Sequence, residues 1–107
     1  MKYDACVTPR CPIRTTLELV GGKWKLLIIF QLAQGPLRLH ELRRHLPDIS
    51  EKMIIQELKL LVDGALVQRT NFGEVPPRVE YNLTAKGHLA LPLIGAMHDF
   101  AQAYTQD

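Results

Sequence analysis

The chain has 107 residues, of which 47% are hydrophobic, and its formal net charge at pH 7 is +2. This length allows one domain with a modest core, and the composition excludes a disordered chain. No apolar run reaches the ~20 residues needed to span a bilayer, and the N-terminus lacks the apolar segment of a signal peptide. We therefore expect a cytoplasmic protein, in which thiols stay reduced unless something oxidises them.

The charge is unevenly distributed along the chain. Twelve of the thirteen Lys and Arg residues lie at or before Arg78, and only Lys86 follows it. A basic body with a neutral, apolar C-terminal part favours contact with a polyanion by the first part and self-association by the last. A mildly basic, solvated surface is the alternative interpretation of the charge alone.

Two helices are expected before residue 37. The first runs from Pro12, which suits a first helical turn, to the Gly21-Gly22 pair. The second starts near Lys23 and ends at Gly35-Pro36. Because the second helix is apolar nearly all round, we expect it to be the central buried helix.

The next segment predicts two helices joined by a tight turn. A short helix with a basic outer face is expected over 39–46, and Pro47 stops it. Ser50 is a good N-cap for the following helix, which ends at Asp63-Gly64. Helical spacing gives this helix an inward apolar stripe of Ile54, Leu58 and Leu61.

Two strands and a helix complete the chain. Residues 66–72 and 78–83 are strand candidates on either side of a proline-stiffened tip at 73–77. Thr84 is expected to cap one long last helix. Pro92 should kink that helix, because proline removes one backbone donor and crowds the preceding turn.

Helix, turn, helix and two-stranded ribbon are together typical of a winged helix-turn-helix, which places one helix in the DNA major groove. We therefore expect a mainly α fold with a small β-hairpin (α+β), over residues 11–107, after an N-terminal arm at residues 1–10. The alternative for the helix pair alone is an ordinary αα-hairpin in a helical core. The hairpin has little core to bury, and this favours the winged form.

The first turns after Ser50 carry the candidate base-reading residues. Gln can read adenine through two hydrogen bonds, and Lys can reach guanine or a phosphate. Arg78 follows the hairpin tip, where a wing meets phosphate or the minor groove; its alternative role is a solvated charge at a strand edge. From the residues alone, the DNA-binding candidates are Ser50, Glu51, Lys52, Met53, Gln56, Lys59 and Arg78.

Two sequence blocks are specific, Gly-Gly-Lys-Trp-Lys at 21–25 and Val-Pro-Pro-Arg-Val-Glu-Tyr at 75–81. Together with Cys11-Pro12 and Ile49-Ser50, they resemble the HxlR family of bacterial transcriptional regulators, which is similar to the MarR type. The resemblance runs from Cys11 to about Phe100 and so covers nearly the whole chain. It implies a winged-helix homodimer on operator DNA, with the first and last helices forming the dimer interface.

The resemblance also implies further DNA contacts on the supporting helix and at the start of the central helix, namely Arg43, Arg44, Lys23 and Lys25. For the two lysines, the alternative is that they only solvate the end of their helix. The chain departs from the commoner family pattern at Glu51 and Ile55, where uncharged polar residues are more usual. An acid there repels phosphate but accepts from cytosine, so the operator sequence is in doubt more than DNA binding.

The two cysteines are candidate redox sensors. Cys11 matches the Cys-Pro position that is a redox- or electrophile-sensing thiol in several members of the family it resembles. Arg10, Arg14 and the start of a helix should favour its thiolate. Cys6 lies five residues upstream, within reach of an intrachain or intersubunit disulfide. The alternative is a cysteine that only packs.

The last helix carries more apolar side chains than one small domain can cover, so we expect a homodimer. Its interface is expected to comprise Ile13, Leu17, Leu89, Leu93, Met97, Phe100 and Tyr104. A two-fold dimer places its recognition helices in major grooves roughly 34 Å apart, on a near-palindromic operator. We expect a repressor that responds to an effector or to thiol oxidation. The alternative is a protein-interaction module without DNA binding, which Glu51 and the low net charge favour.

Nothing in the sequence supports catalysis or a metal site. Ser50 is the only serine, and its capping role explains it. The Gly21-Gly22-Lys23 stretch lacks the spacing of a phosphate-binding loop. Cys6 and Cys11 have neither a nearby histidine nor a second cysteine pair. We expect no metal, no cofactor and no enzymatic activity; the expected partners are double-stranded DNA and a second copy of the chain, with no membrane.

Overall fold

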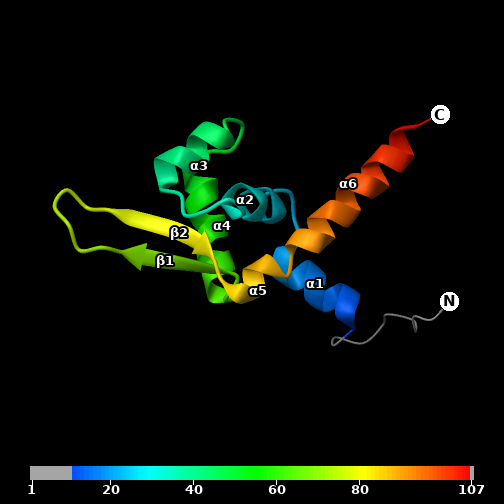
Figure 1. Cartoon of the computed structure of the whole chain (residues 1–107), viewed down its shortest axis with the longest axis horizontal. Helices are drawn as coiled ribbons and strands as arrows, with labels where there is room; N and C mark the ends of the chain where they lie inside the picture. Colours follow the sequence, from blue (N-terminus) through cyan, green and yellow to red (C-terminus); the bar gives the residue numbers. More distant parts are fainter. Residues whose placement is uncertain (1–10, 107) are drawn as a thin grey trace.

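The computed structural model describes residues 11–106. In this part of the chain the elements are α1 (Pro12–Val20), α2 (Lys25–Leu32), α3 (Leu39–His45), α4 (Glu51–Asp63), β1 (Val67–Asn71), β2 (Val79–Leu83), α5 (Ala85–His88) and α6 (Leu91–Thr105). Figure 1 shows α2, α3 and α4 gathered into one body, with the β1–β2 hairpin projecting at one end and α6 at the other. The expected mainly α fold with one small hairpin is confirmed.

α1 begins and ends where the sequence predicts. Cys11 is its N-cap, because the Cys11 Sγ atom accepts a hydrogen bond from the Arg14 amide at 3.4 Å. At the other end, the Gly21 amide donates to the Leu17 carbonyl at 2.8 Å. A side chain at position 21 would be obstructed, because its Cβ would lie 2.2 Å from the Leu17 carbonyl oxygen.

α2 begins at Lys25 and is buried on only part of its surface. Ile28 and Ile29 are fully buried, whereas Leu27 and Phe30 are exposed. α2 is thus the central helix that we expected, but it is buried on one side and not throughout. The elements packed against α2, which are α3, α4, α6 and β2, leave an apolar strip of it uncovered.

α3 and α4 form the expected helix pair. The Glu41 carboxylate accepts a hydrogen bond from the Arg38 amide at 2.9 Å, which fixes the start of α3 and holds the pKa of Glu41 below its usual value. Ser50 caps α4, because its Oγ accepts from the Met53 amide at 3.2 Å. The predicted inward stripe of α4 is confirmed, since its apolar residues are buried in the core: Ile54, Leu58 and Leu61.

The end of α4 has the hydrogen bonds of a Schellman motif. The Leu66 amide donates to the Leu61 carbonyl at 3.0 Å, and the Ala65 amide donates to the Val62 carbonyl at 2.9 Å. Gly64 is the C-cap, but its φ is −82°, and the left-handed residue is Ala65 with φ 63°. The glycine that the sequence places at the helix end thus lies one position before the residue that adopts the left-handed conformation.

The hairpin pairs β1 with β2 antiparallel, with Val67 opposite Leu83 and Asn71 opposite Val79. Val67 and Leu83 are buried, so the hairpin is anchored at that end and projects at the other. Leu37 and Tyr81 exchange two backbone hydrogen bonds of 2.9 and 2.8 Å. The segment between α2 and α3 is therefore attached to β2, a contact that the sequence did not indicate.

The region after Thr84 forms two helices rather than the single kinked helix that we expected. Thr84 caps α5 by accepting from the Gly87 amide at 3.0 Å, but α5 ends at His88. The next two amides bond carbonyls only three residues back, and Pro92 then occupies the first turn of α6. Proline has no amide to donate to the His88 carbonyl and its ring crowds that group, so the helix breaks instead of bending.

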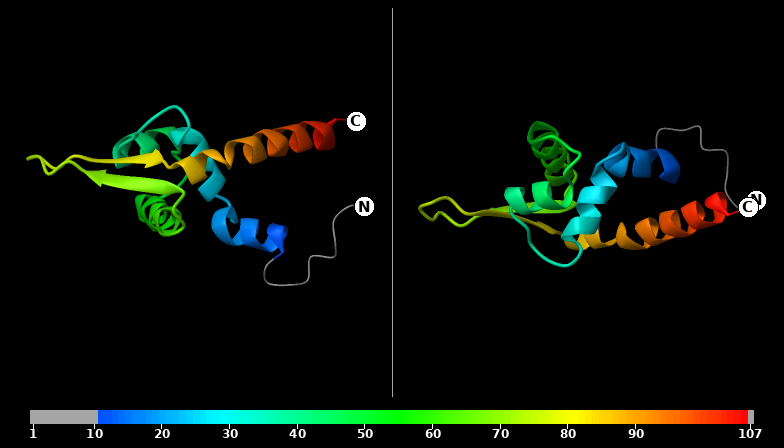
Figure 2. Two further views of the ribbon diagram at one scale, coloured as in Figure 1. Left: turned by 60° about the horizontal axis from the view of Figure 1, so that its bottom comes forward. Right: turned by 90° about the horizontal axis from the view of Figure 1, so that it is seen from above.

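α6 contributes little to the core of the described chain. None of its residues is buried, although it packs against α2. Both views in Figure 2 show α6 extending away from the body that α2, α3 and α4 form. Within residues 11–106, no helix is long and apolar enough to cross a membrane.

Replacing Ala65 by glycine should raise the free energy of unfolding. The left-handed conformation costs an L-residue roughly 1–2 kcal/mol, whereas glycine adds about 0.4–1 kcal/mol of unfolded-chain entropy. We therefore expect Ala65→Gly to gain about 0.5–1 kcal/mol, measured by urea unfolding. Gly87→Ala is the opposite control, because its Cβ would lie 2.1 Å from the Leu66 carbonyl oxygen. A lower urea midpoint for Ala65→Gly would contradict this account.

Candidate nucleic-acid interface

The side of α4 opposite the core is an exposed, basic surface. Lys52, Gln56 and Lys59 recur at helical spacing along one face, and all three are exposed. Neither lysine makes an ion pair with another residue in the described part of the chain. Met53 stands beside them, and its amide is held by Ser50. The serine hydroxyl is thus engaged in capping, which orients the helix start.

An ion pair connects the end of α3 to the start of α4. Arg43 Nη1 lies 3.5 Å from Glu51 Oε2, and both side chains are about half exposed. An ion pair so open to water contributes roughly 0–1 kcal/mol, so Arg43 remains able to exchange its carboxylate for a phosphate. Arg44, the next residue, is exposed and makes no ion pair within residues 11–106.

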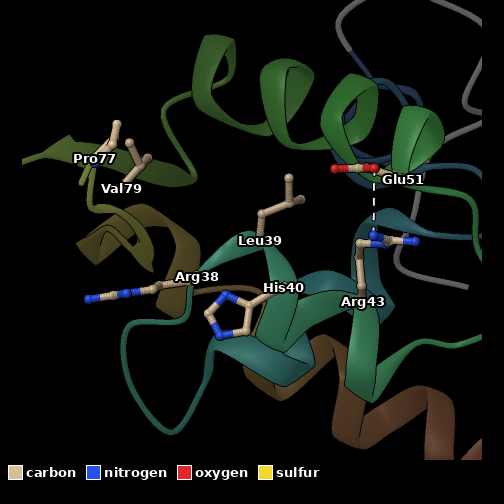
Figure 3. Close-up of a pocket in the computed structure, with 7 residues that line it drawn as sticks. All are labelled: Arg38, Leu39, His40, Arg43, Glu51, Pro77 and Val79. Atoms are coloured by element: carbon tan, nitrogen blue, oxygen red, sulfur yellow. Dashed lines mark ion pairs between the residues drawn. The ribbon is translucent and has the colours of Figure 1, made fainter. Parts of the chain in front are cut away.

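A cleft of about 270 Å³ lies between α3, the start of α4 and the hairpin. Figure 3 shows Arg43 pointing toward Glu51, while Arg38 and His40 project from the start of α3. Three nitrogen-bearing side chains thus share the cleft with one carboxylate, and this charge balance suits an anion. The cleft is lined by Arg38, Leu39, His40, Arg43, Glu51, Pro77 and Val79.

Arg78 is held against the hairpin rather than extended from it. Its guanidinium carbon lies 3.8 Å from the centroid of the Phe72 ring, a cation–π contact. Its Nε atom lies 3.6 Å from a Glu74 oxygen and 4.0 Å from a Glu80 oxygen. That atom is buried and has no hydrogen-bond partner among residues 11–106. Two carboxylates therefore lower the positive potential where the sequence predicts a wing contact.

The structure separates two of the predicted DNA-binding lysines from this surface. Lys25 Nζ lies 2.7 Å from Glu57 Oε2, and both side chains are largely buried between α2 and α4. Lys23 Nζ lies 4.7 Å from the centroid of the Trp24 ring and borders a groove between α2 and α6. Because the charge of Lys25 is already paired inside the protein, it is not placed to neutralise a phosphate.

Four residues of this region were missed by reasoning from the sequence. Arg38 and His40 line the cleft, and the signal for them was their position at the start of a basic helix. Arg69 is exposed on β1, opposite Tyr81, on a strand that we considered only for pairing. Glu57 is buried on the apolar side of α4, where its spacing from Ile54 places it.

The residues expected at a dimer interface are mostly exposed in the single chain. Phe100 and Tyr104 expose 71% and 79% of their surface, and their rings stack with centroids 6.2 Å apart. Leu93 differs, because it is partly buried against the core. Four more of the predicted set are exposed on α1, α6 and the break before α6: Ile13, Leu17, Leu89 and Met97.

Of the two cysteines, the structure describes Cys11, which is disulfide-bonded. Cys11 is buried at the start of α1, where its sulfur caps the helix. Cys6 lies outside the described residues. Among residues 11–106, no three His, Cys, Asp or Glu side chains are grouped so that they could hold a metal ion.

The fold agrees with that of known proteins. Residues 19–107 match the family model described as HxlR-like helix-turn-helix. Over 94 residues the chain is 37% identical to YdeP of Bacillus subtilis strain 168, an uncharacterized HTH-type transcriptional regulator, and the match covers 88% of this chain and 73% of YdeP.

Solved structures give the same result. One from Porphyromonas gingivalis W83, assigned to the MarR family of transcriptional regulators, matches with a TM-score of 0.86 and 43% identity over 92% of this chain and 97% of that one. The redox regulator HypR in its oxidised form matches with a TM-score of 0.82 and 34% identity, over 91% of this chain and 99% of HypR.

The winged helix-turn-helix architecture and the resemblance drawn from the sequence are therefore confirmed. Relatives of this kind are transcriptional regulators, not enzymes, as expected. The chain belongs to the HxlR family of helix-turn-helix transcriptional regulators.

Proposed function

We propose that this transcriptional regulator is a homodimeric, sequence-specific DNA-binding repressor that acts by occupying its operator. The observation that carries the proposal is the division of α4 into two sides. The inner side is buried in the core, whereas the outer side presents Lys52, Gln56 and Lys59 to solvent from a capped helix start. A side chain on the first turns of a helix held in this way can reach base edges in the major groove.

The proposed contacts divide into positioning and reading. Arg43, Arg44 and Lys59 neutralise phosphates and set the register of the protein on the duplex. Lys52, Met53 and Gln56 read bases, and Glu51 accepts from a cytosine amine. Arg38 and His40 add phosphate contacts from the cleft beside the hairpin, because they lie on the same side as Arg43.

A second candidate function is a protein-interaction module with the same shape. Acids beside the exposed arginines favour it: Glu51 pairs with Arg43, and Glu74 and Glu80 flank Arg78. DNA binding and protein binding differ in their dependence on salt, because only binding to DNA releases the counterions condensed on the duplex.

Alanine variants test the proposed contacts by gel shift at several salt concentrations. Gln56→Ala should weaken binding to the preferred duplex by about 1–3 kcal/mol and relax specificity at one base position. Arg43→Ala should weaken binding to all duplexes alike and lower the salt slope by about 1. Lys86→Ala, an exposed lysine on α5, is the control and should change neither. Unaltered duplex binding in both test variants would refute the assignment.

The proposed dimer covers the apolar surfaces of α1 and α6. These helices expose apolar side chains that nothing within the described chain covers, and α2 adds Leu27 and Phe30. Between α2 and α6 lies a groove of about 780 Å³ with a mainly apolar lining, continuous with the exposed face of α6. A monomer rarely presents apolar surface of this extent.

An acid placed in that surface should dissociate the dimer without unfolding the chain. Phe100→Glu and Leu17→Glu introduce charge at positions that are exposed in the monomer, so the core remains intact. By light scattering at micromolar concentration, we expect the wild type at twice the 12.1 kDa chain mass and both variants closer to one. Val75→Glu places the same charge at an apolar residue exposed on the hairpin, outside the proposed interface, and should stay dimeric. A monomeric wild type would contradict the proposal.

Thiol oxidation is a further proposed input. Cys11 caps α1, so any change at its sulfur alters the start of a helix in the proposed dimer interface. The similarity to the redox regulator HypR supports this input. In the proposed step, the Cys6 and Cys11 thiols lose two protons and two electrons to diamide and form one S–S bond, and diamide is reduced to the hydrazide.

Diamide should therefore change operator affinity at least about fivefold, the lower end of typical coupling between sites. Gel shifts of fully reduced and of diamide-treated protein measure the change, and Cys6→Ser and Cys11→Ser should each abolish it. Equal affinities for the reduced and treated wild type would exclude a thiol input.

A further inference from the structure

Glu57 is the charged residue that α4 buries in the core. It lies on the same side of the helix as Ile54 and Leu58, at a position where helical spacing calls for an apolar side chain. Among residues 11–106, it is the one polar or charged residue that is buried. Because an unpaired carboxylate in such surroundings is strongly unfavourable, its partner determines what the residue can do.

The partner is Lys25, the first residue of α2. The Lys25 ammonium lies 2.7 Å from a Glu57 carboxylate oxygen, and the two side chains are 14% and 12% exposed. This charge-assisted hydrogen bond joins the start of α2 to the middle of α4. The pair therefore connects α2 to α4. The relative placement of these two helices determines how far the outer side of α4 projects toward a bound duplex.

An apolar stripe and an ion pair constrain a helix differently. Apolar contacts are non-directional, so they define the rotation of α4 about its axis less sharply than a directional hydrogen bond does. A hydrogen bond of 2.7 Å does not survive such a movement. Compared with apolar packing, a buried ion pair adds little net stability, and its better-attested use is to fix one arrangement among several.

We propose that Lys25 and Glu57 are positioning residues for DNA recognition, which set the rotation and depth at which α4 presents Gln56 and Lys52. Gln56 directly precedes Glu57, so a rotation of α4 that breaks the ion pair also displaces the Gln56 amide from its base. This inference rests on the proposed DNA-binding function and assigns Lys25 an internal role in place of a phosphate contact.

The test compares specific with non-specific binding. The probes are a duplex enriched from a random-sequence pool by the wild-type protein and a shuffled duplex of equal length and composition. Lys25→Met/Glu57→Leu replaces the ion pair by apolar side chains of similar size. We expect the ratio of the two affinities to fall about tenfold, as when one base is no longer read. The salt slope on the shuffled duplex should not change, and circular dichroism should show a folded protein.

Two further variants complete the design. Lys59→Met removes an exposed lysine from the same helix and should lower the salt slope by ~0.9 for each phosphate that the protein no longer neutralises, while the affinity ratio stays constant. Glu57→Gln keeps the side-chain shape and one acceptor oxygen for Lys25, so this variant should fold. Its ratio of specific to non-specific affinity should fall less than that of the double variant. It also carries the test if the double variant does not fold.

The outcomes separate the inference from the function on which it rests. An unchanged ratio in the Lys25→Met/Glu57→Leu and Glu57→Gln variants overturns the positioning role. A lower salt slope in the double variant identifies Lys25 as a phosphate contact and also overturns it. If the wild-type protein enriches no sequence from the pool, the proposed sequence-specific DNA binding is refuted, and so is the positioning role that rests on it.

Discussion

The packing of one side of α4 against the core is the constraint on which the whole candidate interface depends. Ile54, Leu58 and Leu61 are buried to within about 1% of their surface. Because these three residues lie on one side of the helix, the opposite side faces away from the core, and its polar residues stay in solvent. The candidate recognition surface thus follows from core formation, and its residues can vary in identity without loss of the core packing.

The electrostatics of this surface are weaker than a count of its cations suggests. Arg43 is paired with Glu51, Arg78 is flanked by two glutamates and Lys25 is paired inside the protein. Within residues 11–106, Lys52, Lys59 and Arg44 make no ion pair, so the positive charge of this surface rests mainly on them.

Local patterns predicted the elements of this fold well. Ser50 as a cap, Pro47 as a stop and the stripe of α4 each depend on a few neighbouring residues, so their effect is visible in the sequence. The break before α6 was underestimated, because Pro92 signals a disturbance but not how completely the preceding turn gives way.

Contacts between distant segments could not be predicted in this way. The Lys25–Glu57 pair joins residues 32 positions apart, and either residue alone looks like an ordinary surface charge. The same holds for the bridge between Leu37 and Tyr81 and for the partial exposure of α2, which depend on how the elements assemble. Sequence patterns indicated which residues could contact DNA, whereas the assembled chain decides which of them have their charge available.

The poorly covered α6 has a consequence for how the protein behaves in the cell. The first turn of this fifteen-residue helix packs against the core, whereas its later apolar residues are exposed. Under the proposed homodimer, the order of this later part depends on the partner. Folding and association are then linked by mass action, and stability rises with the amount of protein made. Such a regulator would bind its operator most weakly when its concentration is low, shortly after synthesis begins. Its expression level would then itself control its activity.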